Sequence, residues 1–155
     1  MVTVPARGDP VTMTMTTIAE TLAEHATFEH YSAGRVLFRE GEEPRGVYIV
    51  HSGQVDLVFS GKKGHTKPLR QAQDGQILGL SCVLSHRKHD CSATTKTFCD
   101  LGFIERDTFL AQIDHSPNAW FSVLQLLSQD VNSCYECMRA IRDEESKEKE
   151  KKAAK

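Results

Sequence analysis

Glycines that recur among short apolar runs constrain the fold of this chain more than any other feature. The stretch GRVLFREGEEPRGVYIVHSGQVDLV begins at Gly34 and carries further glycines at Gly41, Gly46 and Gly53. Its runs RVLF, VYIV and VDLVF are apolar or alternating, and LGFIE follows the same pattern further along. Strands joined by turns at intervals of about eight to twelve residues indicate an all-β sandwich or barrel. We therefore expect β structure from residue 28 to residue 109.

Side chains that alternate within these runs predict the inner face of the sheets. Because successive residues of a strand point to opposite faces, every second residue should face the core. The predicted inward residues are Val36, Phe38, Val47, Ile49, Val55 and Leu57. The segment SGKKGH is expected to form a hairpin turn, with Gly61 and Gly64 able to take positive φ angles.

The N-terminal segment divides into two parts. Residues 1–15 have a composition that seldom packs, and they are expected to form a flexible leader. Apolar residues then recur at helical spacing, which predicts a short helix that ends near Ala26. Thr16 or Thr17 is the expected N-cap. The apolar residues of this helix are Ile18, Leu22, Ala23 and Ala26.

From Ser116 onward the sequence predicts one long helix, because residues 118–155 contain neither glycine nor proline. Ser116 can cap this helix, and Pro117 suits its first position. Seven side chains then follow at alternating intervals of four and three, the heptad pattern of a coiled-coil seam. They are Trp120, Leu124, Leu127, Val131, Cys134, Met138 and Ile141. We expect residues 116–142 to form a dimerisation helix.

Two further predictions concern the same helix. Phe121, Val123 and Leu126 lie off the seam, so the first turns should present a second apolar face to the β domain. Residues 143–155 carry five acidic and five basic side chains, whose charges cancel. This segment is interpreted as a charged tail, a solvated helix end or a frayed end, and not as a nucleic-acid-binding arm.

Length and charge exclude several classes of protein. A chain of 155 residues is typical of one domain, and a net charge of −2 argues against a nucleic-acid or anionic-membrane footprint as the main surface.

No run approaches the roughly 18 apolar residues of a membrane span, and the N-terminus lacks the apolar run of a secretory signal. Five cysteines at irregular spacing fit a reducing compartment. A cytoplasmic location is therefore expected.

These motifs together resemble the cyclic-nucleotide-binding domain of the catabolite-activator/FNR (Crp/Fnr) regulator family. The resemblance covers about residues 17–142 and rests on FEHYSAGRVLFREGEEPRGVYIVHSGQVDLV, then DGQILGL and CSATT. It implies a mainly β fold with flanking helices: a double-stranded β-helix (jelly-roll) sensor domain over residues 16–115, then the dimerisation helix. Regulators of this family carry a helix-turn-helix domain after that helix. Only fourteen residues follow Ile141, which implies a module without the DNA-binding domain.

The phosphate-binding cassette departs from the family pattern. In the family, a Gly-Glu pair opens the cassette and binds the ribose, and an Arg-Ser/Thr-Ala triplet closes it and binds the cyclic phosphate. Here Leu80 follows Gly79, and Cys91 precedes Ser92 and Ala93, so both gripping side chains are missing. We therefore predict no binding of cAMP in the usual way and no cofactor. The candidate ligand-binding residues are Gly79, Leu80, Ser81, Cys82, Arg87, Cys91, Ser92 and Ala93.

Some details of the cassette leave alternatives open. Arg87 and Lys88 lie in its loop and either swing inward or remain solvated. The amides of residues 81–84 could form a helix N-terminus that attracts an anion. His86, His89, Asp90 and Cys91 lie together in HRKHDC, but their spacing matches no established zinc site, so no metal is predicted.

Catalytic and redox motifs do not support an enzyme. The sequence contains no nucleophile elbow, Walker loop or zincin motif. Cys134 and Cys137 form a C-x-x-C spacing, but they lie far from the helix N-terminus that would acidify a thiol. We interpret them as helix residues at or beside the seam, with redox sensing through them and through Cys82, Cys91 or Cys99 as the alternative.

Three functions are consistent with these features. The first is a stand-alone sensory or regulatory module, homodimeric through its long helix, that acts on a regulator partner and binds neither DNA by itself nor membranes. The second is a structural or heterodimerising subunit for full-length Crp/Fnr-type transcription regulators. The third is the sensor fragment of such a transcription factor.

Overall fold

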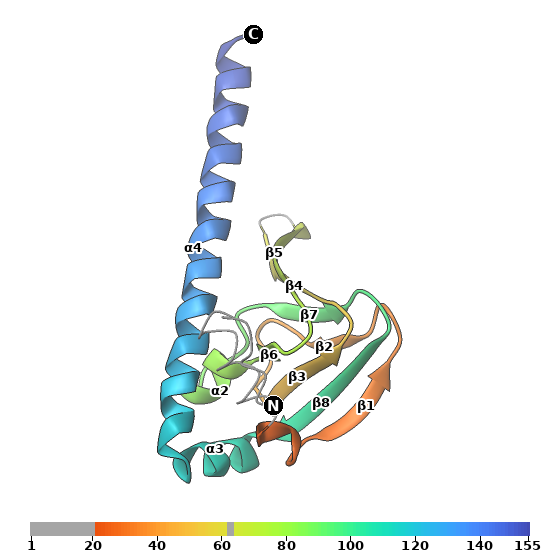
Figure 1. Ribbon diagram of the computed structural model, residues 1–155. Coiled ribbons are helices and arrows are strands. Elements are labelled where there is room, and N and C mark those ends of the chain that lie inside the picture. Colours follow the sequence, from red (N-terminus) through yellow and green to blue (C-terminus); the bar gives the residue numbers. More distant parts are fainter. Residues whose placement is uncertain (1–20, 62–63) are drawn as a thin grey trace, which may run out of the picture.

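Two antiparallel sheets face each other, and a long C-terminal helix runs along one side of them (Figure 1). This is a computed structural model, and it describes residues 21–61 and 64–155. The expected leader and the first part of the expected N-terminal helix lie outside the described residues. Within them, residues 21–23 are helical and a turn follows at residues 24–25, just before the first strand.

Eight strands and three helices make up the rest of the described chain. The strands are β1 (Thr27–Tyr31), β2 (Val36–Phe38), β3 (Gly46–Ser52), β4 (Val55–Ser60), β5 (Thr66–Ala72), β6 (Ile77–Leu78), β7 (Ser92–Thr95) and β8 (Cys99–Glu105). The helices are α2 (Leu80–Ser85), α3 (Arg106–Asp114) and α4 (Pro117–Ala153). One sheet has the order β1-β8-β3-β6 and the other β2-β7-β4-β5, with every pair antiparallel. The expected mainly β fold with flanking helices is confirmed.

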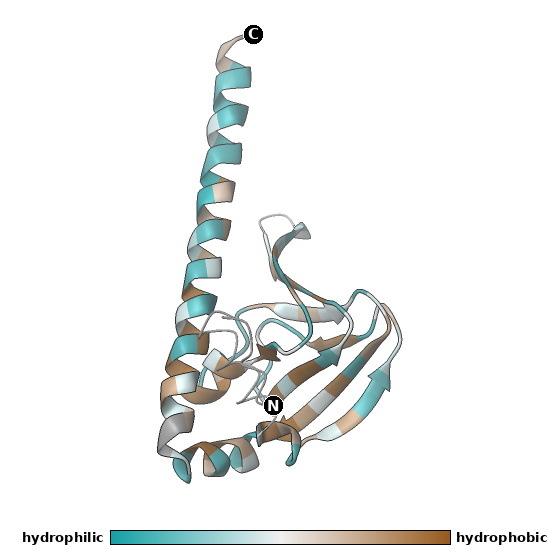
Figure 2. Cartoon of the chain, viewed as in Figure 1, coloured by the Kyte–Doolittle hydropathy of each residue, from teal (hydrophilic) through white to brown (hydrophobic). Residues whose placement is uncertain are grey.

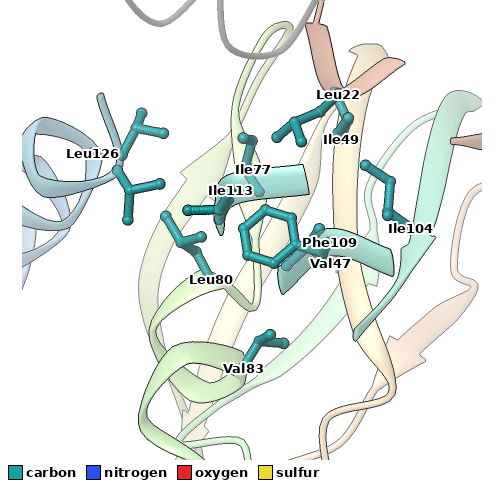
Figure 3. Close-up of a cluster of buried hydrophobic side chains, with 11 residues drawn as sticks. Leu22, Val47, Ile49, Ile77, Leu80, Val83, Ile104, Phe109, Ile113 and Leu126 are labelled. Carbon is teal, nitrogen blue, oxygen red and sulfur yellow. The ribbon is translucent and has the colours of Figure 1, made fainter. Parts of the chain in front are cut away.

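The sheet β1-β8-β3-β6 is covered on both faces, so its central strands bury side chains on both sides. Val47 and Ile49 of β3 belong to a cluster on the helical side that also contains Phe109, Ile113 and Leu126 (Figure 3). The next residue, Val50, points to the opposite face and belongs to the second cluster, which lies between the two sheets. This explains why the run VYIV is almost continuously apolar.

The inward positions predicted by alternation are correct with one exception. Phe38, Val47, Ile49, Val55 and Leu57 are each at most 6% exposed. Val36 is 39% exposed, so its prediction was wrong. The pairing of β2 with β7 shifts register between Val36 and Phe38, and such an irregularity breaks the simple alternation of faces.

The β region ends earlier than the sequence predicted. Strand β8 stops at Glu105, and helix α3 begins at the next residue, so the expected β structure up to residue 109 was wrong. Neither glycine nor proline marks this boundary. Phe109 and Ile113, both fully buried, lie four residues apart and therefore on one face of α3, which packs on the sheet.

The hairpin between β4 and β5 is the one expected around SGKKGH. Ser60 pairs with Thr66, the amide of Gly61 donates to the carbonyl of His65 at 2.6 Å, and Gly64 has a φ of 76°. Further from the turn, the register of this hairpin shifts by one residue between Leu57 and Val58. That shift determines which face of β5 each later side chain occupies.

Helix α4 has two contrasting halves. Pro117 occupies its first turn as expected, and Ser116 takes the N-cap position in an extended conformation without a side-chain capping hydrogen bond. Its first turns pack on the β domain through Val123 and Leu126, which are 1% and 6% exposed. Phe121, expected on the same face, is 64% exposed, so that prediction was wrong. The hydrophilic C-terminal half extends away from the sheets (Figure 2).

Candidate functional site

A short helix, α2, follows the sheet at the position where the sequence predicts the cassette. Gly79 links β6 to α2 with a φ of 82°, a backbone conformation that favours glycine. A side-chain carbon at this position would lie 3.4 Å from both the Gly46 carbonyl oxygen and Cε1 of His89. Gly79 therefore allows the chain to turn tightly between the sheet and the loop that closes the cassette.

The two positions that depart from the family pattern are filled by side chains without charge. Leu80 is 2% exposed and packs in the cluster on the helical side of the sheet. Cys91 is half-buried, and burial together with the nearby Cys82 raises the pKa of its thiol to about 11. Both groups are neutral at physiological pH, so neither offers the carboxylate or the cation that the family pattern supplies.

His89 fills space beside the cassette. Its ring stacks on Phe38 with the centroids 3.9 Å apart and the planes at 11°, and the residue is 5% exposed. The backbone around it is held to the β2–β3 loop, since Gly41 donates to the His89 carbonyl at 2.8 Å and the His89 amide donates to the Glu42 carbonyl at 2.9 Å. Burial lowers the pKa of His89, which favours the neutral ring.

The loop cations point away from the cassette. Arg87 forms an ion pair with Asp90 at 3.3 Å, and its side chain is 69% exposed. Lys88 lies 3.9 Å from Glu43, and both of these side chains are also well exposed. The sequence left open whether Arg87 and Lys88 swing inward or remain solvated, and in the structure both side chains are solvated.

Ser92 and Ala93 begin strand β7 and have structural contacts. The Ser92 hydroxyl accepts a hydrogen bond from the amide of Glu40 at 2.9 Å, and Ala93 is fully buried between the sheets. Ser81 lies in α2, where its hydroxyl is 3.9 Å from the thiol of Cys82. Helix α2 is only six residues long.

A cavity of about 120 Å³ lies between the cassette, the sheet β2-β7-β4-β5 and helix α4. Its apolar wall consists of Phe38, Leu57, Leu69 and Leu80. Three cysteines, Cys82, Cys91 and Cys134, also line it. The charged groups at its wall are Arg70, Asp90 and Asp130, beside the neutral ring of His89.

Arg70 reaches this cavity because of its place in the sheet. Leu57 of β4 pairs with Arg70 on one side and with Ala93 on the other, so the three residues form one rung. Paired residues of adjacent strands project to the same face. Leu57 and Ala93 are buried between the two sheets, and Arg70 therefore projects inward too.

The guanidinium of Arg70 joins the cassette region to helix α4. Its Nη2 lies 3.0 Å from Oδ1 of Asp130, and the two side chains are only 20% and 33% exposed. Burial raises the pKa of Asp130, while the charge of Arg70 acts in the opposite direction. This ion pair is poorly solvated, so a change at either partner has a larger effect than at an exposed pair.

Sequence reasoning missed Arg70, Asp130 and the stacking of His89 on Phe38. The available signal was weak, because β5 reads TKPLRQA, in which a single arginine looks like an ordinary surface residue. Counting outward from the hairpin turn would even place Arg70 on the outer face. The sequence also places His86, His89, Asp90 and Cys91 together as a possible metal cluster. In residues 21–61 and 64–155, no group of three His, Cys, Asp or Glu side chains is arranged to hold a metal ion.

The seam residues of α4 divide between exposed and half-buried positions. Trp120, Leu124, Val131 and Met138 are 42%, 59%, 51% and 64% exposed, and Cys134 is exposed as well. Leu127 is half-buried against the core, and Ile141 is half-buried further along. Tyr135, which the seam did not include, is 58% exposed on the same side of the helix as Val131 and Met138. We call these exposed residues, from Trp120 to Met138, the open face of α4.

The architecture defines the class of the protein: a double-sheet β roll that carries a small helical cassette and ends in a long helix. A family model for the cyclic nucleotide-binding domain matches residues 28–116. This chain therefore belongs to the cyclic nucleotide-binding domain family, as the resemblance in the sequence implied.

Solved structures show the same fold. The catabolite activator protein of Thermus thermophilus has a TM-score of 0.70 at 20% identity, over 81% of this chain and 59% of that one. The c-di-GMP responsive global regulator CLP of Xanthomonas campestris has a TM-score of 0.68 at 18% identity, over 77% and 61%. A cyclic nucleotide-binding-like protein of Brucella abortus is 26% identical over 63% of this chain and 84% of that one, with a TM-score of 0.54.

This chain spans less than two thirds of the length of the first two regulators. A search of curated protein sequences finds no significant match. No helix within the described ranges is long and apolar enough to cross a membrane.

Proposed function

We propose that this chain is a dimeric sensory module of the cyclic nucleotide-binding fold whose cassette does not bind cAMP or cGMP in the usual way. It acts in the cytoplasm as a regulator rather than as an enzyme. It passes a change at the cassette through helix α4 to a regulator partner and does not bind DNA by itself.

The observation that carries this proposal is the filling of the cassette. Leu80 is buried in the core, Cys91 carries a neutral thiol, and His89 is stacked on Phe38 beside them. The remaining space is about 120 Å³. A cavity of about 150 Å³ holds a benzene molecule, and a cyclic nucleotide is several times larger.

The coupling to α4 is supported by the ion pair between Arg70 and Asp130. One partner lies on the inner face of β5 and the other on the helix, and both line the same cavity. A ligand that competes for either charge would shift the packing of α4 on the roll. A poorly solvated pair of this kind has few alternative partners, so its two members respond together.

Dimerisation is supported by the open face of α4. Several large apolar side chains on one side of the helix are between 42% and 64% exposed, at heptad spacing. Contiguous apolar surface on a soluble domain marks an interaction site. A two-fold pair of α4 helices would bury this surface in both copies.

Calorimetry with cyclic nucleotides tests the proposed function directly. Titration of the chain with cAMP, cGMP and c-di-GMP should produce no saturable heat at micromolar ligand. The third nucleotide is included because the similar Xanthomonas campestris regulator is described as c-di-GMP responsive. A micromolar dissociation constant for any of the three would contradict the proposal. Cys91→Arg, which returns a cation to the cassette, serves as a comparison variant.

A mobility-shift assay tests the absence of DNA binding. With a net charge of −2 and a tail whose charges cancel, the chain has no excess of basic side chains for phosphate contacts. No shift is expected at physiological salt, even at high protein concentration. A sequence-selective shift that weakens with salt would contradict this part of the proposal.

A heterodimerising subunit is the second candidate, and the continuation of the seam favours it. Extending the spacing of four and three beyond Ile141 leads to Glu145 and Glu148, both exposed. In a parallel homodimer each glutamate would face its own copy, and like charges in such positions are destabilising. A partner helix with basic residues there would remove the repulsion. Sedimentation of the isolated chain separates the two candidates, because the second predicts a monomer.

A further inference from the structure

The guanidinium of Arg70 has more hydrogen-bonding capacity than its protein contacts use. The side chain is only 20% exposed. Guanidinium offers five N–H donors in a fixed fork. In the part of the chain that the structure describes, this group contacts one oxygen of Asp130, at 3.0 Å. The single contact with Asp130 therefore leaves most of these donors unused, and an acceptor that binds through two oxygens would use more of them.

The cavity beside Arg70 selects for a small apolar body. Phe38, Leu57, Leu69 and Leu80 are the large apolar residues of its wall, and its volume is about 120 Å³. A dry cavity of about 150 Å³ lined by similar side chains accommodates benzene. The space is therefore suited to a ring or a branched chain of about five or six carbons. A group of nucleotide size does not fit within this volume.

We propose that the cavity binds a small monocarboxylate with an apolar body, whose carboxylate group pairs with the guanidinium of Arg70 in place of Asp130. The inference rests on the proposed function, since it names the ligand class of the same sensory site. Arginine suits this role because its parallel N–H donors match the two oxygens of a carboxylate. Here the cation is Arg70 of β5, whereas the family pattern has an arginine at the position of Cys91, just before β7.

The other charges at the cavity fit this assignment. Asp90 is already paired with Arg87, and its side chain is 64% exposed. His89 is buried as a neutral ring stacked on Phe38. Asp130 is therefore the acceptor that the ligand must displace from Arg70. Because Asp130 belongs to α4, its release transmits binding to the helix.

Titration calorimetry with benzoate as the probe tests the inference, with benzyl alcohol as the neutral control of similar size. The full chain should bind benzoate with a dissociation constant below about 1 mM, and benzyl alcohol at least about tenfold more weakly. Arg70→Gln should abolish saturable benzoate binding. Asp130→Asn should strengthen it about fivefold to tenfold, because the competing carboxylate is removed. Arg35→Gln, at an exposed cation that does not line the cavity, should leave it unchanged.

Several outcomes would overturn the inference. These are no saturable heat with benzoate in the unmodified chain, equal binding of benzyl alcohol, or weaker binding in Asp130→Asn. If Arg70→Gln fails to fold, the direction of the Asp130→Asn effect decides. Binding of cAMP by the unmodified chain would instead contradict the proposed function, so the two failures are distinguishable.

Discussion

The two apolar faces of helix α4 differ in what covers them. Val123 and Leu126 point to the roll and are at most 6% exposed, whereas Leu124 and Met138 are 59% and 64% exposed. At 3.6 residues per turn, Leu124 and Leu126 lie about 160° apart around the helix. Residue type does not distinguish them, because both are leucine. The difference shows that one face stabilises the fold of the single chain and the other is available to a second helix.

The largest expected effect is on stability. Leu126→Ala should lower the free energy of unfolding by about 2–5 kcal/mol, because it leaves a cavity in a packed core. The matched variant Leu124→Ala should change it by less than about 0.5 kcal/mol. Urea unfolding at low protein concentration, where association does not contribute, measures both. Equal losses would mean that the open face of α4 packs within its own chain.

The next effect concerns association. Leu124→Asp should weaken the dimer by at least a factor of about 100, since a charge would face its own copy at the centre of an apolar interface. Sedimentation at tens of micromolar should then show monomers. Leu124 is a better site than Leu127, which is half-buried against the core. Asn132→Asp, on another side of the exposed helix, is the control and should remain dimeric.

Cysteine cross-linking sharpens the position of the interface. Cys134 is exposed and follows the heptad spacing, whereas the thiol of Cys137 lies 3.7 Å from the Pro68 carbonyl oxygen on the roll. Mild oxidation should give a reducible dimer that Cys134→Ser abolishes and Cys137→Ser does not, because a disulfide needs its two Cβ atoms about 4 Å apart. A cross-link that depends on Cys137 instead would indicate a different helix pairing.

The smallest effect is the pH dependence from His89, which belongs to the closed cassette rather than to α4. Burial lowers the pKa of this ring, although the nearby Glu42 and Asp90 raise it. In the unfolded chain this histidine has a pKa of about 6.5 and binds a proton more readily than in the folded chain. The contribution of His89 to stability is therefore fully present above that pH, and it is lost as the pH falls through the lower pKa of the folded state.

Urea unfolding at pH 7.5 and at pH 5.5 measures this loss of stability. His89→Phe should reduce the difference between the two pH values, while His65→Gln, at an exposed ring, should not alter it. An unchanged difference in His89→Phe would show that other groups cause the pH dependence.

Patterns of short range predicted most of the fold. The glycine spacing and the apolar runs predicted the strands, and proline with the long uninterrupted segment predicted α4 from its first turn. Helix α3 was missed because Glu105 and Arg106 join strand and helix without any breaker. Its two core residues, Phe109 and Ile113, are informative only once the sheet they cover is known.

The cassette was predicted in its differences from the family but not in its contacts. The absence of Glu and Arg at Leu80 and Cys91 is visible in the sequence. The burial of His89 against Phe38 is not, because about fifty residues separate the two side chains and only the folded loops bring them together.

Arg70 marks the boundary between what the sequence determined and what the tertiary structure decided. The sequence by itself determined a β roll with a cassette that lacks its usual charges, because glycine spacing, alternation and residue identity are local properties. The hairpin then shifts register by one residue between Leu57 and Val58. A shift of one residue exchanges the two faces of a strand, so Arg70 projects between the sheets and meets Asp130 instead of water. That shift is a property of how the strands pair, and it places a cation at the wall of the cavity.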